Sequence, residues 1–344
     1  MITRKKICII ISLIIGIIFI INLGGDQIEA ISLKRFHQNI NREVLYVGGS
    51  GPGNFSKIQD AIDYASSGDN IFVFHGIYLE NISVYKRLSI IGECKENTII
   101  DAKNKGYSIN ISVDGVSVSG FTIQNGSYSG NLINKANLFI NSSDNIIKEN
   151  IFKYSESGIM ILNSNRNNIS DNIISDNVIG LWIIGSKNNV YKNLIINNSN
   201  IGIDLLGSEN IISNNMILNN NDIGLYLIDS SKNYILNNEI SNNSIGIVLT
   251  WNRENDENRN NVISKNNFRN NTKSDSGFVE HFGIDQKNIW KNNYWEKSRL
   301  FPKLILGLKQ TRFYFPTPFG ALWFFIPWFH FDLNPATQPY LITI

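Results

Sequence analysis

The sequence predicts an all-β solenoid, in which short parallel strands stack coil upon coil, and two observations support this fold class. A phrase of glycine, apolar, variable and apolar residues recurs at an unbroken interval of 22 residues. It opens at Gly158, Gly180, Gly202, Gly224 and Gly246. Within each repeat the apolar residues alternate with polar ones, which is the period of a strand and not of a helix. Self-similarity at a period of about 20 residues is typical of stacked supersecondary units.

A second phrase, Asn-x-apolar-x-x-Asn-x-apolar, lies upstream of each glycine phrase. It begins at Asn145, Asn167, Asn188, Asn210 and Asn233, and a worn copy begins at Asn261. Codon bias would explain why asparagine is abundant, but it does not explain the fixed phase. Stacked amides hydrogen-bond to one another as a ladder, and asparagine tolerates the left-handed conformation of a tight bend. We therefore predict a structural ladder of asparagines, with the glycines serving where a bend needs positive φ or where backbones pack closely.

Each repeat is expected to hold about three short strands, because asparagine, serine and glycine divide its β-branched segments. One repeat cannot bury its apolar face alone, so the coils stack around a continuous inner column. Residues 44–295 have room for about eleven coils, spaced about 4.8 Å apart. Ahead of the regular repeats we expect strands at residues 71–74, 88–91, 99–101, 109–113, 116–118, 121–123 and 138–140.

A short helix is predicted ahead of these strands. Ser56 and Gln59 have the spacing of a capping box, and Gly68 is expected to end the helix. Its apolar face consists of Ile58, Ala61, Ile62 and Ala65. Such a helix would cover the open first coil, whose unpaired backbone groups otherwise invite another strand to pair.

The chain begins with basic residues at positions 4–6, and an apolar stretch follows at residues 7–23. This order is typical of an export signal or of a single membrane anchor whose positive end stays in the cytoplasm. Because the cleavage site near Ala30 is weak, we favour an uncleaved anchor helix over a signal peptide. We expect residues 1–30 to form this segment and residues 31–43 to form a linker. The protein would then lie outside the cytoplasm, at the cell surface.

Charge and cysteine content exclude several function classes. The 31 basic and 29 acidic residues leave a net charge of +2, which argues against nucleic-acid binding. Cys94 is the only cysteine outside the first apolar stretch, so an intrachain disulfide framework is excluded. No cofactor and no metal site are expected.

The last segment, residues 296–344, differs from the repeats. Basic residues at its start are followed by an aromatic stretch that Pro316, Pro318 and Pro327 interrupt. The prolines exclude a membrane-spanning helix. We expect the segment to pack on the last coil and cap it, and the alternative is a patch that contacts a membrane surface. The insertion at residues 251–260 is expected to form an outer loop.

One outward column of side chains is the candidate ligand-binding site. In register, the repeats place Met160, Trp182, Asp204, Tyr226 and Val248 in this column. Trp182 and Tyr226 would lie about 10 Å apart with Asp204 between them. Aromatic rings that flank an acid suit a sugar, because rings stack on its apolar face and the carboxylate accepts hydrogen bonds from its hydroxyl groups. The alternative interpretation is ordinary decoration of a strand face.

Two further motifs follow the predicted helix, within residues 46–93. They read GD-x-I-x-V-x-x-G-x-Y and K-x-L-x-I-x-G. Together with the repeats, they resemble the right-handed parallel β-helix proteins of the pectin-lyase-like superfamily. The resemblance is to the NosD-type group in particular, also described as carbohydrate-binding and sugar-hydrolysis domains, and it covers roughly residues 44–295. It implies a single-stranded, right-handed parallel β-helix, a fold that hosts many activities.

These observations favour an exported protein with a structural or carbohydrate-binding role, whose partners are cell-envelope glycans. The first alternative is a polysaccharide lyase or hydrolase. Hydrolysis usually needs two carboxyl groups. The candidate pairs are Asp204 with Asp222 or Asp229, and Asp171 with Asp176.

The second alternative comes from the resemblance, which implies an accessory role in maturing a copper enzyme. A copper site favours His, Met or Cys side chains, and the four histidines are widely separated in the sequence. His281 and His330 would meet only if the last segment folds back.

Overall fold

The computed structural model describes six ranges of the chain, residues 43–127, 135–250, 259–281, 288–296, 301–314 and 321–344. All of them fall in one compact unit, Arg42–Ile344, while a second unit, Met1–Asn41, lies outside the described residues. The predicted anchor helix at residues 7–23 and most of the insertion at residues 251–260 therefore also lie outside them. Among the residues that are described, no helix is long and apolar enough to cross a membrane.

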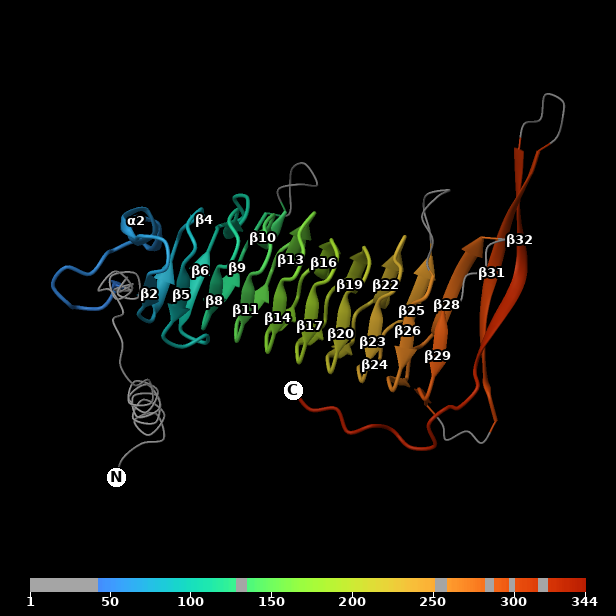
Figure 1. Cartoon of the computed structure of the whole chain (residues 1–344). Coiled ribbons are helices and arrows are strands. Elements are labelled where there is room, and N and C mark those ends of the chain that lie inside the picture. The colour runs from blue at the N-terminus through green and yellow to red at the C-terminus, as the bar shows by residue number, and fades with distance from the viewer. Residues whose placement is uncertain (1–42, 128–134, 251–258, 282–287, 297–300, 315–320) are drawn as a thin grey trace, which may run out of the picture. The chain divides into compact units, whose positions relative to one another are not determined.

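The predicted fold class is confirmed, because the strands form a parallel β-helix with three sheets that run side by side (Figure 1). Sheet A contains β1 (Val44–Val47), β2 (Asn70–Val73), β5 (Ser89–Gly92), β8 (Ser117–Ser119), β11 (Ile146–Lys148), β14 (Asn168–Ser170), β17 (Asn189–Tyr191), β20 (Ile211–Ser213), β23 (Tyr234–Leu236), β26 (Val262–Ser264) and β29 (Ile289–Lys291). Sheet B contains β3 (Gly76–Tyr78), β6 (Thr98–Asp101), β9 (Thr122–Gln124), β12 (Ile151–Lys153), β15 (Ile173–Ser175), β18 (Leu194–Ile196), β21 (Met216–Leu218), β24 (Glu239–Ser241), β27 (Asn267–Arg269) and β30 (Tyr294–Trp295). Sheet C contains β4 (Ile82–Val84), β7 (Ile109–Ile111), β10 (Ala136–Ile140), β13 (Ser157–Leu162), β16 (Ile179–Ile184), β19 (Ile201–Leu206), β22 (Ile223–Ile228), β25 (Ile245–Thr250), β28 (Ser274–His281), β31 (Lys303–Tyr314) and β32 (Ala321–Asp332).

The interior consists of apolar columns that run from coil to coil. In sheet A, for example, Ile147, Ile169, Val190 and Ile212 lie in register and are fully buried. Because successive side chains of a strand point to opposite faces, the alternation read from the sequence turns one set of apolar residues inward on every coil. The columns therefore join into one continuous core.

Asparagine side chains stack at the bends between sheets and form three ladders. They run through Asn145, Asn167, Asn188, Asn210, Asn233, Asn261 and Asn288, through Asn150, Asn172, Asn193, Asn215, Asn238, Asn266 and Asn293, and through Asn177, Asn198, Asn220, Asn243 and Asn271. At each step the Nδ2 of one asparagine donates to the Oδ1 of the next, at 2.9–3.3 Å. The ladders therefore satisfy amides that the fold buries.

The expectation that the ladder asparagines themselves adopt the left-handed conformation is wrong. Positive φ occurs instead on the preceding residue, wherever that residue is described, for example 61° at Asp144, before Asn145, and 57° at Arg166, before Asn167. The residue that makes the bend points outward and is free to be of any polar type. The asparagine that follows points inward, where its amide bonds to the neighbouring coil.

The glycines of the repeated phrase serve close packing and not positive φ. Gly202 has no positive φ, and a Cβ placed on it would lie 2.5 Å from the carbonyl oxygen of Gly224. The same Cβ would lie 2.9 Å from Nδ2 of Asn220. Adjacent coils therefore approach too closely at this position for any side chain.

The helix α2 (Ile58–Tyr64) packs on β1, β2 and β4, but the predicted capping box is wrong. The N-cap residue is Lys57, and no side chain caps the helix from that position. Instead, the carboxylate of Glu80 accepts hydrogen bonds from the backbone N–H groups of Ile58 and Gln59, at 2.9 and 3.0 Å. The cap comes from a residue that is distant in sequence and acidic, which suits the positive end of a helix.

The C-terminal strands close the stack at its other end. β31 pairs with β28 in parallel, and β32 pairs with β31 in the antiparallel sense. Asp332 at the end of β32 is fully buried and occupies the next position of the second ladder. Its Oδ2 accepts from the backbone N–H and from Nδ2 of Asn293, at 2.9 and 3.1 Å, and from Nε1 of Trp295 at 3.0 Å.

Candidate functional site

The outer face of sheet C carries the column that the sequence predicts. Trp182 on β16 lies opposite Asp204 on β19, and Asp204 lies opposite Tyr226 on β22. Met160 and Val248 extend the column at its two ends. The register therefore brings together all five side chains, each about 4.8 Å along the stack from the next.

Mainly apolar side chains flank this column. The position two residues further along each strand is occupied by Leu162, Ile184, Leu206, Ile228 and Thr250. All five of these side chains are half-buried. Asp204 is therefore a single acidic residue on a largely hydrocarbon surface.

The carboxyl group of Asp204 is poorly hydrated although it lies on the outside of the coil. The residue is only 9 % exposed, and its Oδ1 has no hydrogen-bond partner. Burial raises the pKa of this carboxyl to about 6. Because a buried acceptor without a partner is unfavourable, the position suits a ligand that donates a hydrogen bond.

The two rings beside Asp204 are half-buried. Burial raises the pKa of the Tyr226 phenol, and the negative charges of Asp204 and Asp229 raise it further. Trp182 packs against a small apolar cluster, outside the main core, that contains Phe139 and Met160. The surface therefore offers apolar ring faces on both sides of one hydrogen-bond acceptor.

The column continues toward the first coils through residues that the sequence analysis missed. Phe139 lies opposite both Met160 and Asn110, and the ring of Tyr107 stacks on it with centroids 4.4 Å apart. Burial raises the pKa of Tyr107 to about 12. The Tyr107 hydroxyl and Oδ1 of Asn110 also lack hydrogen-bond partners. The spacing of these coils in the sequence is irregular, so it could not be used to align them with Trp182.

The regular coils match a known family of proteins. The family model described as "Right handed beta helix region" matches residues 109–261 and residues 179–299, which together exceed half of the chain. The chain belongs to this family. No curated protein matches the sequence.

The solved structures that resemble this β-helix protein share its fold, at sequence identities too low to indicate a shared function. DFA-IIIase from Arthrobacter chlorophenolicus A6, in complex with DFA-III, is 11% identical with a TM-score of 0.52, covering 77% of this chain and 84% of that one. Alginate lyase from Paenibacillus sp. str. FPU-7 is 14% identical with a TM-score of 0.46, covering 69% and 87%. Pectin methylesterase PemA from Erwinia chrysanthemi is 14% identical with a TM-score of 0.42, covering 67% and 80%.

The carboxylates considered as hydrolytic partners do not join Asp204 in its column. Asp222 directly precedes β22 and Asp229 directly follows it, so they lie at the two ends of that strand. Asp171 and Asp176 occupy left-handed bends on either side of β15, in sheet B. The β-helix therefore separates these acids among different bends.

The two histidines considered for copper are also separated by the register. His281 lies opposite Gln310, and His330 lies opposite Ile305. Gln310 and Ile305 are five positions apart on β31, which is about 16 Å along an extended strand. Within the described part of the chain, no group of three or more His, Cys, Asp and Glu residues could hold a metal ion.

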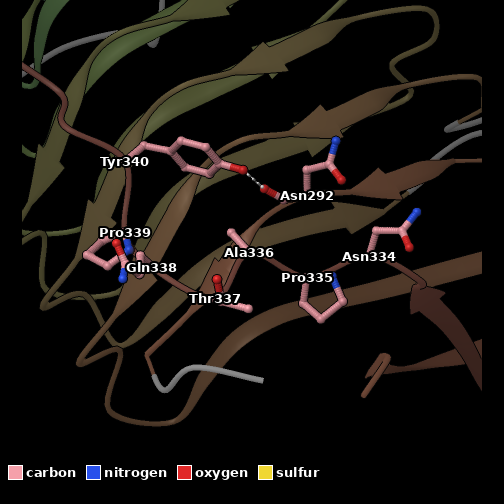
Figure 2. Close-up of a pocket in the computed structure, with 8 residues that line it drawn as sticks. All are labelled: Asn292, Asn334, Pro335, Ala336, Thr337, Gln338, Pro339 and Tyr340. Carbon is pink, nitrogen blue, oxygen red and sulfur yellow. Dashed lines mark hydrogen bonds between the residues drawn. The ribbon is translucent and has the colours of Figure 1, made fainter. Parts of the chain in front are cut away.

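A pocket of about 520 Å³ lies elsewhere, between the coil near β29 and the C-terminal segment that runs back along it (Figure 2). Asn292 and residues 334–340 line it. The hydroxyl of Tyr340 donates to the backbone oxygen of Asn292 at 2.6 Å and holds the segment against the coil. None of these lining residues is charged, whereas the surface around Asp204 combines a carboxyl group with aromatic rings.

Proposed function

We propose that this β-helix protein is exported to the cell surface, where it binds carbohydrate on the outer face of sheet C. The observation that carries the proposal is the buried carboxyl of Asp204, whose Oδ1 has no hydrogen-bond partner, between the rings of Trp182 and Tyr226. A sugar supplies what this surface needs, since its hydroxyl groups donate hydrogen bonds and its C–H faces pack on aromatic rings. The basic start and the apolar stretch at residues 7–23 support export, which makes cell-envelope glycans the expected ligands.

Affinity electrophoresis tests the binding. The full-length protein, in mild detergent, is run through gels that contain alginate, polygalacturonate or solubilised cell-wall glycan. We expect at least one polysaccharide to retard the protein. Asp204→Ala should weaken the retardation about tenfold or more, because a hydrogen bond to a charged group contributes about 2 kcal/mol. Trp182→Ala should also weaken it clearly, because it removes the ring on which the sugar packs.

Tyr234→Ala is the matched control, because this ring is 47% exposed on sheet A, away from the column. It should leave the retardation unchanged. The binding proposal fails if no polysaccharide retards the protein, or if Tyr234→Ala weakens the retardation as much as Trp182→Ala does.

The titration of Asp204 favours a second candidate, a polysaccharide hydrolase in which this carboxyl is the general acid. Burial raises its pKa to about 6, and a general acid has to stay protonated near its working pH. A hydrolase would shorten the polysaccharide and release new reducing ends, and Asp204→Asn would abolish that release. Retardation of the protein without any shortening of the polysaccharide supports the binding protein instead.

A further inference from the structure

The two ends of the β-helix stack present different surfaces to solvent. At the first coil, α2 buries its apolar residues and exposes the carboxylates of Asp60 and Asp63. Terminal units of a solenoid need a polar outer face of this kind to stay soluble. The last coil is closed by the β31–β32 hairpin, whose outer face has the opposite character.

The hairpin turns one face toward the last coil and the other face away from it. Ile305 and Asp332 belong to the inner face and are buried. The side chains of the outer face are Leu304, Leu306, Leu308, Phe325, Phe329 and Phe331, and they are 37–65% exposed. In the antiparallel register Leu304 lies opposite Phe331, and Leu306 lies opposite Phe329, so these side chains form one continuous apolar surface. We call this surface the hairpin outer face.

The charge of the segment that contains the hairpin indicates what covers this face. Residues 297–331 include three lysines and two arginines but no aspartate or glutamate. Two copies of the chain that met through this face would bring two positively charged segments together, which disfavours a dimer. An anionic lipid surface attracts the basic residues and also accepts the leucine and phenylalanine side chains.

We propose that the hairpin outer face binds the surface of an anionic lipid bilayer. The net positive charge of the segment attracts the last coil to the headgroups, while the leucines and phenylalanines of the hairpin outer face enter the boundary between headgroups and acyl chains. This contact is separate from the predicted anchor at residues 7–23, and it does not depend on the proposed carbohydrate site around Asp204.

Vesicle co-sedimentation tests the proposal with a fragment of residues 42–344. These residues form one compact unit that contains the whole described core, so the fragment keeps every element described above and lacks the apolar N-terminal stretch. We expect it to sediment with vesicles of phosphatidylcholine mixed with phosphatidylglycerol. It should sediment much less with vesicles of phosphatidylcholine alone, and added salt should release it.

The double variant Leu306→Glu with Phe329→Glu adds two acids to one cross-strand pair of the hairpin outer face. It should lower the bound fraction at least about tenfold. The matched control, Ile146→Glu with Ile211→Glu, makes the same change at two side chains of sheet A that are 43% and 41% exposed, and it should bind as the unaltered fragment does. Circular dichroism and thermal unfolding establish that both variants are folded.

Three results would overturn the proposal. The first is that the unaltered fragment binds neutral and anionic vesicles equally. The second is that both double variants bind the anionic vesicles equally well. The third is that the fragment does not bind vesicles and elutes as a dimer that Leu306→Glu with Phe329→Glu separates, which would assign the face to a second copy of the chain.

Discussion

Asp204 shows how a single residue acquires its properties from the coils on either side of it. Trp182 and Tyr226 lie opposite it on the neighbouring strands, and burial is the cause that raises its pKa to about 6. The ordinary pKa of an unfolded aspartate is about 3.9. Between these two values the folded protein binds more protons than the unfolded chain, so its stability falls as the pH rises through this window.

Asp204→Asn should therefore stabilise the protein at neutral pH. Removing the buried charge should raise the free energy of unfolding by about 2 kcal/mol near pH 7.5 and should change it little near pH 4. Urea unfolding at the two pH values measures the difference. Asp171→Asn, at an exposed bend, is the control and should have little effect at either pH. An equal gain for Asp204→Asn at both pH values would contradict a titration set by burial.

At the scale of elements, the ladders explain how the stack ends. In the second ladder each asparagine accepts hydrogen bonds from one coil and donates to the next, so its last member, Asn293, still needs an acceptor. Asp332 of β32 supplies it, with the geometry of the preceding steps. A carboxylate suffices at this position because no further coil needs a donor.

Asp332→Ala should loosen the hairpin from the last coil. It leaves the backbone N–H groups of Asn292 and Asn293, Nδ2 of Asn293 and Nε1 of Trp295 without their acceptor. We expect a loss of about 3 kcal/mol in the free energy of unfolding, together with faster tryptic cleavage after Lys303. Asp332→Asn keeps one acceptor oxygen and should lose clearly less. Equal losses for the two variants would show that the acceptor is not what holds the hairpin.

At the scale of the whole molecule, the regular coils are close to interchangeable. Each coil contacts mainly its two neighbours, through one strand in each sheet and one asparagine in each ladder. Stability in such an array is approximately a sum of terms for coils and for the interfaces between neighbours. Folding therefore depends less on how many coils the chain has than on a constant spacing of the repeats in the sequence.

Deletion of residues 179–200 removes one coil and should yield a folded, monomeric protein of lower melting temperature. The three ladders then continue from Asn167, Asn172 and Asn177 to the asparagines of the next coil but one. Circular dichroism and gel filtration measure the outcome. Deletion of residues 179–189, which breaks the phase, is the control and should give an aggregated product. Equal solubility of the two deletions would show that the phase of the repeat does not govern folding.

Most of the fold could be predicted from the periodicity of the sequence. Because one repeat corresponds to one coil, a constant spacing of glycine and asparagine determines which residues become neighbours, and this spacing alone aligns Trp182, Asp204 and Tyr226. The left-handed bends were assigned to the wrong residues. Two adjacent polar positions at each bend look equivalent in sequence, and only the direction of each side chain separates them.

By itself, the sequence determined the coil, its phase and the outward column, because these depend on contacts that recur at one fixed spacing. The tertiary structure alone decided the Glu80 cap of α2, the Asp332 end of the second ladder and the burial of Asp204. It also decided that Tyr107 and Phe139 extend the column. Each of these depends on a contact between segments at irregular separations, and a local or periodic pattern carries no information about such contacts.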